Sequence, residues 1–185
     1  MIKEIYFAGG CFWGIEKLFS SLPGVTSVIS GYANGREDIV PDYEKVCSGI
    51  TGYKETVKVS YNIEKTSLEA LLFAYFSVID PTIPNRQGFD KGTQYQVGIY
   101  YTDEESEKIV RKIAEIEKTA VSAFVVETEP LLTFFKAEEY HQQYLTKNPN
   151  GYCHINPVRM ARIAEFHISP NEYIKPAKEI LDIKI

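Results

Sequence analysis

Apolar residues recur along the chain with two different periods. Alternating or short continuous apolar runs predict β-strands, whereas apolar residues spaced three and four apart predict helices that bury one face. The pattern predicts strands at 2–8, 25–32, 56–61, 96–101 and 124–128, and helices at 11–22, 68–79, 102–119 and 138–146. The segment 56–61, Thr-Val-Lys-Val-Ser-Tyr, alternates most clearly and should bury one face only.

Turn and capping residues set the bounds of these elements. Pro23-Gly24 closes the first helix, and capping boxes at 66–69 and 102–105 open two others. Residues 80–94 form a long loop rich in Pro, Gly and polar side chains, and long ordered loops are often functional. Beyond Tyr152, prolines at 157, 170 and 176 suggest a strap over the surface. The order of elements predicts helices packed on a mixed sheet, as a two-layer α/β or α+β domain.

Composition narrows the class of protein. The chain has 185 residues, 44% hydrophobic and 24% charged, which fits one globular domain with a trailing extension. A net charge of −5 argues against binding to nucleic acid or to an anionic membrane surface. The start of the chain lacks the features of a signal peptide, and the apolar runs fall short of a membrane span. We therefore expect a cytoplasmic protein.

Three cysteines, at 11, 47 and 153, are an odd number and too far apart for the disulfide framework of a secreted protein. In a reducing compartment, a disulfide among them would be transient and catalytic rather than structural. A zinc site needs about four ligands, and Cys153-His154 has no partner pair at ligand spacing. We expect no metal.

Cys11 stands where a strand gives way to a helix, after Gly9-Gly10 and before Phe12-Trp13. The N–H groups and dipole of a helix start favour a thiolate, and the glycines let a ligand approach the backbone. A free cysteine can equally be a small buried hydrophobic residue. The two aromatic residues alone predict core packing. Local sequence leaves both interpretations of Cys11 open.

The other candidates are weaker when taken singly. Cys47 is expected to be a packing residue, whereas Cys153 is either a thiol on a mobile segment or an exposed bystander. His141 is expected to be packed or hydrogen-bonded. Glu55 lies at the start of a predicted strand and could be an ordinary surface acid. Asp90 and Tyr95 bracket a turn, which could be loop chemistry and nothing more.

Six stretches, taken together and in order, resemble the A-type peptide methionine sulfoxide reductases. The likeness runs from about residue 3 to residue 155, and Gly-Cys-Phe-Trp-Gly is a specific signature of that family. The stretches are Gly10-Cys11-Phe12-Trp13-Gly14, Gly31-Tyr32-Ala33, residues 43–52, residues 86–95, residues 137–145 and Gly151-Tyr152-Cys153. Enzymes of this type reverse one epimer of methionine sulfoxide.

The resemblance implies a role for each matching residue. Cys11 would attack the sulfoxide sulfur and be left as a sulfenic acid. Glu55 would protonate the sulfoxide oxygen, Tyr43 and Tyr95 would hydrogen-bond it, and Asp90 would support them. A neutral carboxyl is needed for this, and an apolar pocket raises the pKa of an acid.

The remaining roles concern recognition and recycling. Phe12 and Trp13 would form the pocket for the substrate methyl group. Cys153 would close a disulfide with Cys11, which thioredoxin, or dithiothreitol in the test tube, then reduces without a bound cofactor. The implied activity is protein repair under oxidative stress: reduction of methionine-S-sulfoxide, free or in proteins.

The resemblance also implies an architecture. It is an α+β two-layer sandwich with a mixed central sheet, ferredoxin-like, plus long loops and a C-terminal strap. Residues 1–155 would be the catalytic domain, and 156–185 an extension packing on the same domain. Two rival functions use the same residues: a thiol hydrolase or acyltransferase with Cys11 and a histidine, and a redox-sensing module without turnover that uses Cys11 and Cys153.

Overall fold

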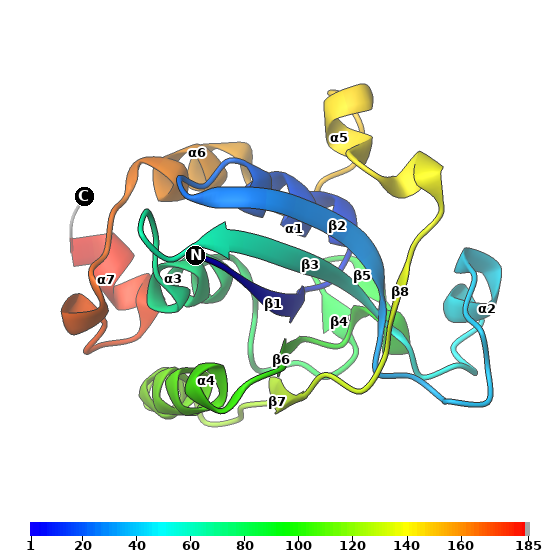
Figure 1. Ribbon diagram of the computed structural model, residues 1–185, viewed down its shortest axis with the longest axis horizontal. Helices are drawn as coiled ribbons and strands as arrows, with labels where there is room; N and C mark the ends of the chain where they lie inside the picture. The colour runs from blue at the N-terminus through cyan, green and yellow to red at the C-terminus, as the bar shows by residue number, and fades with distance from the viewer. Residues whose placement is uncertain (184–185) are drawn as a thin grey trace.

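The computed structural model describes residues 1–183 (Figure 1). Within that range, six strands form one sheet in the order β7-β6-β1-β3-β2-β8. Their bounds are β1 Ile2–Ala8, β2 Val25–Ala33, β3 Lys54–Asn62, β6 Gly98–Tyr101, β7 Glu127–Pro130 and β8 Phe134–Lys136. Neighbouring strands are antiparallel except β6 and β7, which makes the sheet mixed. A separate hairpin consists of β4 (Arg86–Gln87) and β5 (Asp90–Lys91).

The central four strands follow ferredoxin-like connectivity. Helix α1 (Phe12–Ser20) joins β1 to β2, and α3 (Leu68–Val78) joins β3 to β6. The resulting order is β6-β1-β3-β2. In chain order β6 is the fourth of these strands, and it lies beside β1, the first, while β3 lies beside β2. Both helices cover one face, because the Phe7 ring of β1 packs on Phe19 of α1 and on Tyr75 of α3. The predicted α+β class, with its mixed sheet and ferredoxin-like layers, is confirmed.

The alternation predicted for 56–61 decides which side chains of β3 enter the core. Val57, Val59 and Tyr61 are buried toward the helices. Lys58 lies on the opposite face and forms an ion pair with Glu4, with 2.7 Å between Nζ and Oε1. Since side chains two apart along a strand share a face, Glu55 also points into the core.

Some predicted elements differ from those observed. The helix expected at 138–146 is a 3-10 turn (Glu139–His141) followed by α5 (Tyr144–Lys147), because Gln143 between them has φ +53°. The strand expected at 124–128 lies three residues further on, as β7. The short helix α2 (Tyr43–Cys47) and the edge strand β8 were not predicted.

The expected strap is wrong, because the chain from 156 to 183 is largely helical. It contains α6 (Pro157–Glu165), a 3-10 turn (Pro170–Glu172) and α7 (Ala177–Ile183). Pro157 occupies the first turn of α6, where a missing N–H does no harm, and the Asn156 side chain caps that helix. The prolines therefore start or precede helical turns instead of preventing them.

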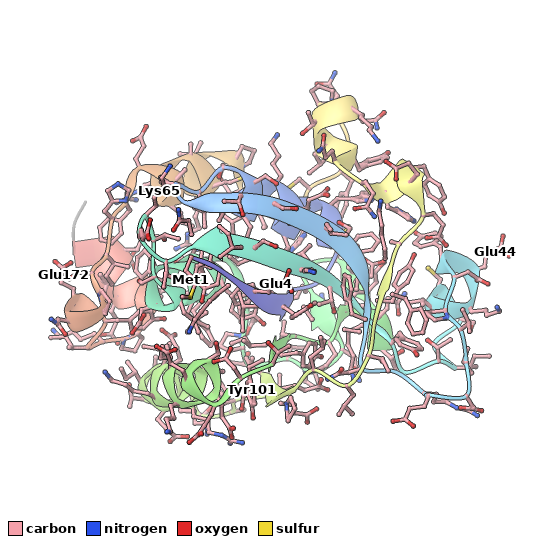
Figure 2. The ribbon with its side chains drawn as sticks, in the orientation of Figure 1. Met1, Glu4, Glu44, Lys65, Tyr101 and Glu172 are labelled. Atoms are coloured by element: carbon pink, nitrogen blue, oxygen red, sulfur yellow. The ribbon has the colours of Figure 1, made fainter. Side chains whose placement is uncertain are left out.

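The C-terminal helices pack onto the side of α3 that faces away from the sheet. Phe166 stacks on Phe73 of α3, with 4.9 Å between ring centroids. Glu117, near the end of α4 (Glu104–Lys118), accepts hydrogen bonds from the Tyr173 hydroxyl and the Ala177 N–H, both at 2.7 Å. Figure 2 shows Glu172 of this extension at the opposite end of the long axis from Glu44 of α2.

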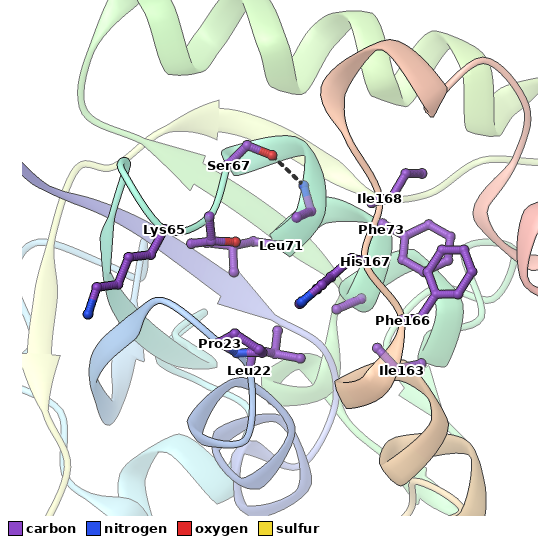
Figure 3. A pocket seen from close by; sticks show the side chains of 13 residues that line it. Leu22, Pro23, Lys65, Ser67, Leu71, Phe73, Ile163, Phe166, His167 and Ile168 are labelled. Atoms are coloured by element: carbon purple, nitrogen blue, oxygen red, sulfur yellow. Dashed lines mark hydrogen bonds between the residues drawn. The ribbon is translucent and has the colours of Figure 1, made fainter.

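A small pocket lies beside the contact between α3 and the start of the extension. It holds about 150 Å³ and lies between the end of α1, the β3–α3 turn and residues 163–168 (Figure 3). Leu22, Leu71, Phe73, Ile163 and Phe166 supply its apolar wall, and Lys65 and His167 also line it. The cavity does not reach the residues expected to carry chemistry.

Candidate active site

The topology gathers the candidate residues at one end of the sheet. In the antiparallel pair β1 and β3, Phe7 lies opposite Val57, so the residues after Ala8 approach the residues before Val57. That register brings Cys11 to Glu55. Strand β6 begins opposite Ala8, and Tyr95 precedes it by a few residues. Strand termini, rather than proximity in sequence, therefore build the site.

Cys11 occupies the N-cap position of α1. Gly10 before it has φ +84°, a conformation that favours glycine, and a Cβ there would lie 2.6 Å from the Gln87 side chain. The next residue, Phe12, donates its backbone N–H to Glu55 Oε2 at 3.0 Å. The start of the helix thus presents the thiol and binds the carboxyl at the same time.

Glu55 is 2% exposed, and its environment favours the neutral acid. The pKa of Glu55 is raised from 4.5 to about 8, mainly by burial; the Phe12 hydrogen bond opposes this shift and the nearby Asp90 charge adds to it. A neutral carboxyl whose Oε2 accepts from Phe12 carries its proton on Oε1. Glu55 is therefore mostly neutral at pH 7, the protonation state that its predicted role requires.

The protonation expected of Cys11 is different. Burial, and next the Glu55 charge, raise the pKa of its thiol, and a hydrogen bond from the Trp13 backbone only partly offsets them. The helix start does favour the thiolate, but burial has the larger effect. The resting residue is a thiol, which corrects the expectation of a thiolate. A neutral Glu55 removes the second of these causes.

Two phenols reach the same place. Tyr43, at the start of α2, and Tyr95 are both half-buried. Burial is the largest cause that raises the pKa of each, so both hydroxyls stay protonated, and ionisation of Glu55 or Cys11 would raise the pKa further. The Tyr43 hydroxyl is hydrogen-bonded to Cys47.

Cys47 is exposed, which overturns the expectation that it packs in the core. It ends a helix of five residues in which only Val46 is buried. Its position beside Tyr43 places a third thiol at the rim of the site. Cys11, Cys47 and Cys153 are all free thiols.

Aromatic residues form a wall beside Cys11. Phe12 is buried and half-buried Trp13 stacks on Tyr144 of α5, with ring centroids 3.7 Å apart and planes 13° apart. The Trp13 Nε1–H donates to His141 Nδ1 at 3.1 Å, so the indole is fixed from two sides. Buried His141 is hydrogen-bonded, as expected, and it also packs against Phe12 and Tyr43.

Tyr152, which precedes Cys153 in the chain, links the segment of Cys153 to Asp90. The Tyr152 hydroxyl donates to Asp90 Oδ2 at 3.0 Å, which holds the 151–155 segment beside the β4–β5 hairpin. Burial, then this hydrogen bond, raises the pKa of Tyr152 to about 12. Cys153 lies against α1, where a Cβ at Gly14 would be 3.2 Å from its Sγ. The second thiol therefore adjoins the first turn of the helix that carries Cys11.

Cys153 is also open to the outside. It lines a mostly apolar groove of about 350 Å³, together with Lys17, Leu145, Pro149, Pro157 and Met160. The sequence did not predict roles for Tyr144 and Tyr152. The partner of each, Trp13 and Asp90 respectively, lies far away in the chain. The dense Tyr-His-Gln-Gln-Tyr run at 140–144 was the one available signal.

The described part of the chain holds neither a metal cluster nor a membrane-spanning helix. Among residues 1–183, His, Cys, Asp and Glu side chains do not gather in threes as a metal ion would require. Over the same range, no helix is long and apolar enough to cross a membrane.

Comparison with known proteins agrees with this geometry. The family profile described as "Peptide methionine sulfoxide reductase" matches residues 3–169. The peptide methionine sulfoxide reductase MsrA of Mycoplasma genitalium is 54% identical over 155 residues, covering 83% of this chain and 98% of that one.

Solved structures give the same result. Reduced Mxr1 from Saccharomyces cerevisiae superposes with a TM-score of 0.77 at 38% identity, covering 82% of this chain and 88% of that one. Mxr1 in complex with Trx2 gives a TM-score of 0.52 at 26% identity, covering 77% and 84%. On the profile match, the sequence identity and the shared fold, this chain belongs to the peptide methionine sulfoxide reductase family.

Proposed function

We propose that this protein reduces methionine-S-sulfoxide, free and within proteins, to methionine through Cys11, Glu55 and Cys153. One observation carries the assignment: the Phe12 N–H joins Glu55 to the helix start that presents Cys11. A sulfoxide sulfur becomes electrophilic when its oxygen is protonated. A neutral carboxyl next to a thiol supplies both partners of that reaction.

The first half-reaction transfers oxygen from the substrate to Cys11. Glu55 gives its Oε1 proton to the sulfoxide oxygen as Cys11 sulfur attacks the substrate sulfur. The thiol proton then restores Glu55, methionine leaves, and Cys11 remains as a sulfenic acid. Tyr43 and Tyr95 donate hydrogen bonds to the same oxygen, and Tyr43 exchanges its bond to Cys47 for this one.

The wall made by Phe12 and Trp13 explains the choice of epimer. An apolar surface takes the methyl group, and each buried CH₂ is worth about 0.8 kcal/mol. The oxygen is fixed on the side of Glu55, Tyr43 and Tyr95. When the methyl group and the oxygen are both held in these positions, only one of the two configurations at sulfur leaves the side of the sulfur that faces Cys11 open to attack.

The second half-reaction restores the thiol. Cys153 attacks the sulfenic sulfur of Cys11, the S–O bond breaks, water leaves and a disulfide forms. A thioredoxin then reduces that disulfide, a proposal supported by the complex of Mxr1 with Trx2. Thiols alone carry the electrons, so the proposal requires no bound cofactor.

Two further assignments complete the proposal. We assign residues 1–155 to the catalytic unit and 156–185, of which 184–185 lie outside the described residues, to an extension on the same domain; the packing of α6 and α7 on α3 supports this. We place the reaction in the cytoplasm, where a transient disulfide between free cysteines can be reduced repeatedly.

The proposal is tested with the separated S and R epimers of methionine sulfoxide. The S epimer should turn over with dithiothreitol, Cys11→Ser should be inactive, and Glu55→Gln should be slower by about 10²–10⁴-fold. Cys153→Ser should work with dithiothreitol but not with thioredoxin, while the matched control Cys47→Ser should work with both. Equal use of both epimers, or full activity of Cys11→Ser, would refute the assignment. A thiol hydrolase would instead tolerate Cys153→Ser and depend on a histidine.

A further inference from the structure

His154 follows Cys153 in the chain, and its imidazole is held in a fixed position close to the proposed active site. Its imidazole lies between the β1–α1 turn and the β4–β5 hairpin. The ring Nε2 is 3.0 Å from the Gly9 carbonyl oxygen. A Cβ at Gly10 would meet the same nitrogen at 3.3 Å, and a Cβ at Gly88 would lie 3.9 Å from the His154 Cβ. The ring is therefore fixed on both sides.

The contact with Gly9 determines the tautomer. A carbonyl oxygen only accepts hydrogen bonds, so Nε2 carries the proton and donates it. Burial is the main cause that lowers the pKa of His154, which keeps the ring neutral at pH 7. In a neutral ring with Nε2–H, the other nitrogen, Nδ1, has a free lone pair. Nδ1 is buried and has no hydrogen-bond partner among the residues described.

That lone pair lies next to the second thiol. The position that a Cβ of Gly14 would occupy is 3.1 Å from His154 Nδ1 and 3.2 Å from Cys153 Sγ. The two atoms therefore lie over the same first turn of α1, no more than about 6.3 Å apart, and only a glycine at position 14 leaves room for both. In the present rotamer the thiol donates to the Ile155 carbonyl at 3.4 Å, and a rotation about its Cα–Cβ bond changes its direction.

We propose that His154 Nδ1 is the base that accepts the Cys153 thiol proton when Cys153 attacks the Cys11 sulfenic acid. Only a thiolate is an effective nucleophile toward sulfur, so this proton must leave. The S–S bond forms as the S–O bond breaks, Cys153 is oxidised and Cys11 sulfur is reduced. The departing hydroxide takes the proton back from Nδ1 and leaves as water, which restores the neutral ring. The inference rests on the proposed function, because it concerns the second half-reaction.

The groups around the imidazole determine how the step should depend on pH. The charge that acts on the ring is that of the Asp90 carboxyl, to which the Tyr152 phenol donates, and the Cys153 thiol lies over the same turn of α1. Asp90 stabilises the imidazolium that forms during the step. With His154 as the base, the rate of disulfide formation should be level from neutral pH up to about 8 and fall only as the ring becomes protonated in acid.

The test is a single turnover of the reduced enzyme with methionine-S-sulfoxide and no reductant. Methionine, dimedone-trapped sulfenic acid and the disulfide are quantified in quenched samples by mass spectrometry. In His154→Gln, an amide can still donate to Gly9 but offers no base. We expect disulfide formation at pH 7 to slow on the order of 100-fold, with sulfenic acid accumulating and added imidazole restoring part of the rate. The rate should then rise about tenfold per pH unit.

His167→Gln, the same change at an exposed histidine in the extension, is the matched control and should behave as wild type. A His154→Gln enzyme that closes its disulfide at the wild-type rate and with the wild-type pH profile would overturn the inference. If that variant does not fold, the wild-type profile decides, because a tenfold rise per pH unit between 6 and 8 would rule out the histidine. Failure of the proposed function looks different: the wild type would then release no methionine.

Discussion

At the scale of single residues, the chemistry depends on one proton. Glu55 is buried on the core face of β3, one of its oxygens is fixed by Phe12, and burial raises its pKa to about 8. The same burial keeps Cys11 protonated, so the resting site holds two neutral groups rather than an ion pair. In the proposed reaction, protons then move toward the substrate oxygen, without a salt bridge having to break first.

The rate of methionine release should therefore fall as pH rises through about 8, because ionised Glu55 has no proton to give. Glu55→Gln should lower this rate by about 10²–10⁴-fold and abolish the fall, since an amide does not ionise. Single-turnover rates between pH 6 and 9.5 measure both effects. Glu44→Gln, an exposed glutamate on α2, is the control. A wild-type rate that stays level to pH 9.5 would contradict the assignment.

The same residue makes stability depend on pH. Its pKa is raised in the folded state from 4.5 to about 8, so folding favours the protonated form. The stability that this provides is complete below about pH 4.5 and is lost as pH rises through about 8. We expect Glu55→Gln to gain a few kcal/mol relative to wild type between pH 5 and pH 9, as measured by urea unfolding. The Glu44→Gln control should show the same pH dependence as wild type, and an identical slope in Glu55→Gln would disprove the account.

At the scale of elements, α1 and the 139–147 segment form one recognition unit. Glu16 of α1 is buried and accepts the Gln143 N–H at 2.9 Å, which fixes the start of α5. From there Tyr144 stacks on Trp13, and His141 binds the indole nitrogen. The pocket wall is thus positioned by a segment 130 residues away in sequence.

Replacing Tyr144 with leucine should loosen that wall. An aromatic pair contributes about 0.5–1.5 kcal/mol beyond its buried area, so KM should rise by about 2–10-fold with little change in kcat. Tyr144→Phe keeps the ring and should keep KM near the wild-type value. Steady-state kinetics with dithiothreitol and a sulfoxide-containing peptide make the comparison. Equal KM values for the two variants would show that stacking does not position Trp13.

Periodicity predicted the elements that bury a continuous apolar stripe, namely β1, α1, β2, β3, α3 and α4. It failed at 138–146, where Gln143 takes a left-handed conformation that no apolar pattern signals. It also failed beyond 156, where prolines suggested a strap. A proline is compatible with a helix when it occupies the first turn, and Asn156-Pro157 was the signal that could have shown this.

At the scale of the whole molecule, the extension is part of the core rather than an appendage. Tyr173 is 1% exposed, and its hydroxyl donates to buried Glu117 on α4. Lys178 of α7 donates to the Ile79 carbonyl at 2.7 Å, beyond the end of α3. Residues 170–183 therefore join two helices that the catalytic strands depend on.

Tyr173→Phe removes one of the two hydrogen bonds that Glu117 Oε1 accepts. We expect a loss of about 1–3 kcal/mol in the free energy of unfolding, with activity per folded molecule unchanged. The control is Tyr140→Phe, which removes a hydroxyl from an exposed tyrosine and should change stability by less than about 0.5 kcal/mol. Urea unfolding of both variants gives the comparison. A Tyr173→Phe protein as stable as wild type would show that the extension is held by apolar packing alone.

The site itself was predictable only through resemblance. Local sequence did not decide whether Cys11 is a packing residue or a reactive one. It also did not distinguish Glu55 from the other acidic residues, of which the chain has 25 in all. What distinguishes them is the antiparallel register of β1 and β3, which is a long-range property. Tyr152 and His154 could not be assigned from local sequence at all, because their partners, Asp90 and Gly9, lie on other loops.

That register also makes correct folding and activity inseparable. A slip of one residue between β1 and β3 would turn every side chain of β3 to the opposite face. Lys58 and Ser60 would then replace Val57 and Val59 in the core, and Glu55 would point to solvent. A misregistered chain would lose its hydrophobic core and its proton donor together. Quality control that removes unstable chains would thereby remove inactive ones, and no stable pool of misfolded, inactive enzyme should accumulate.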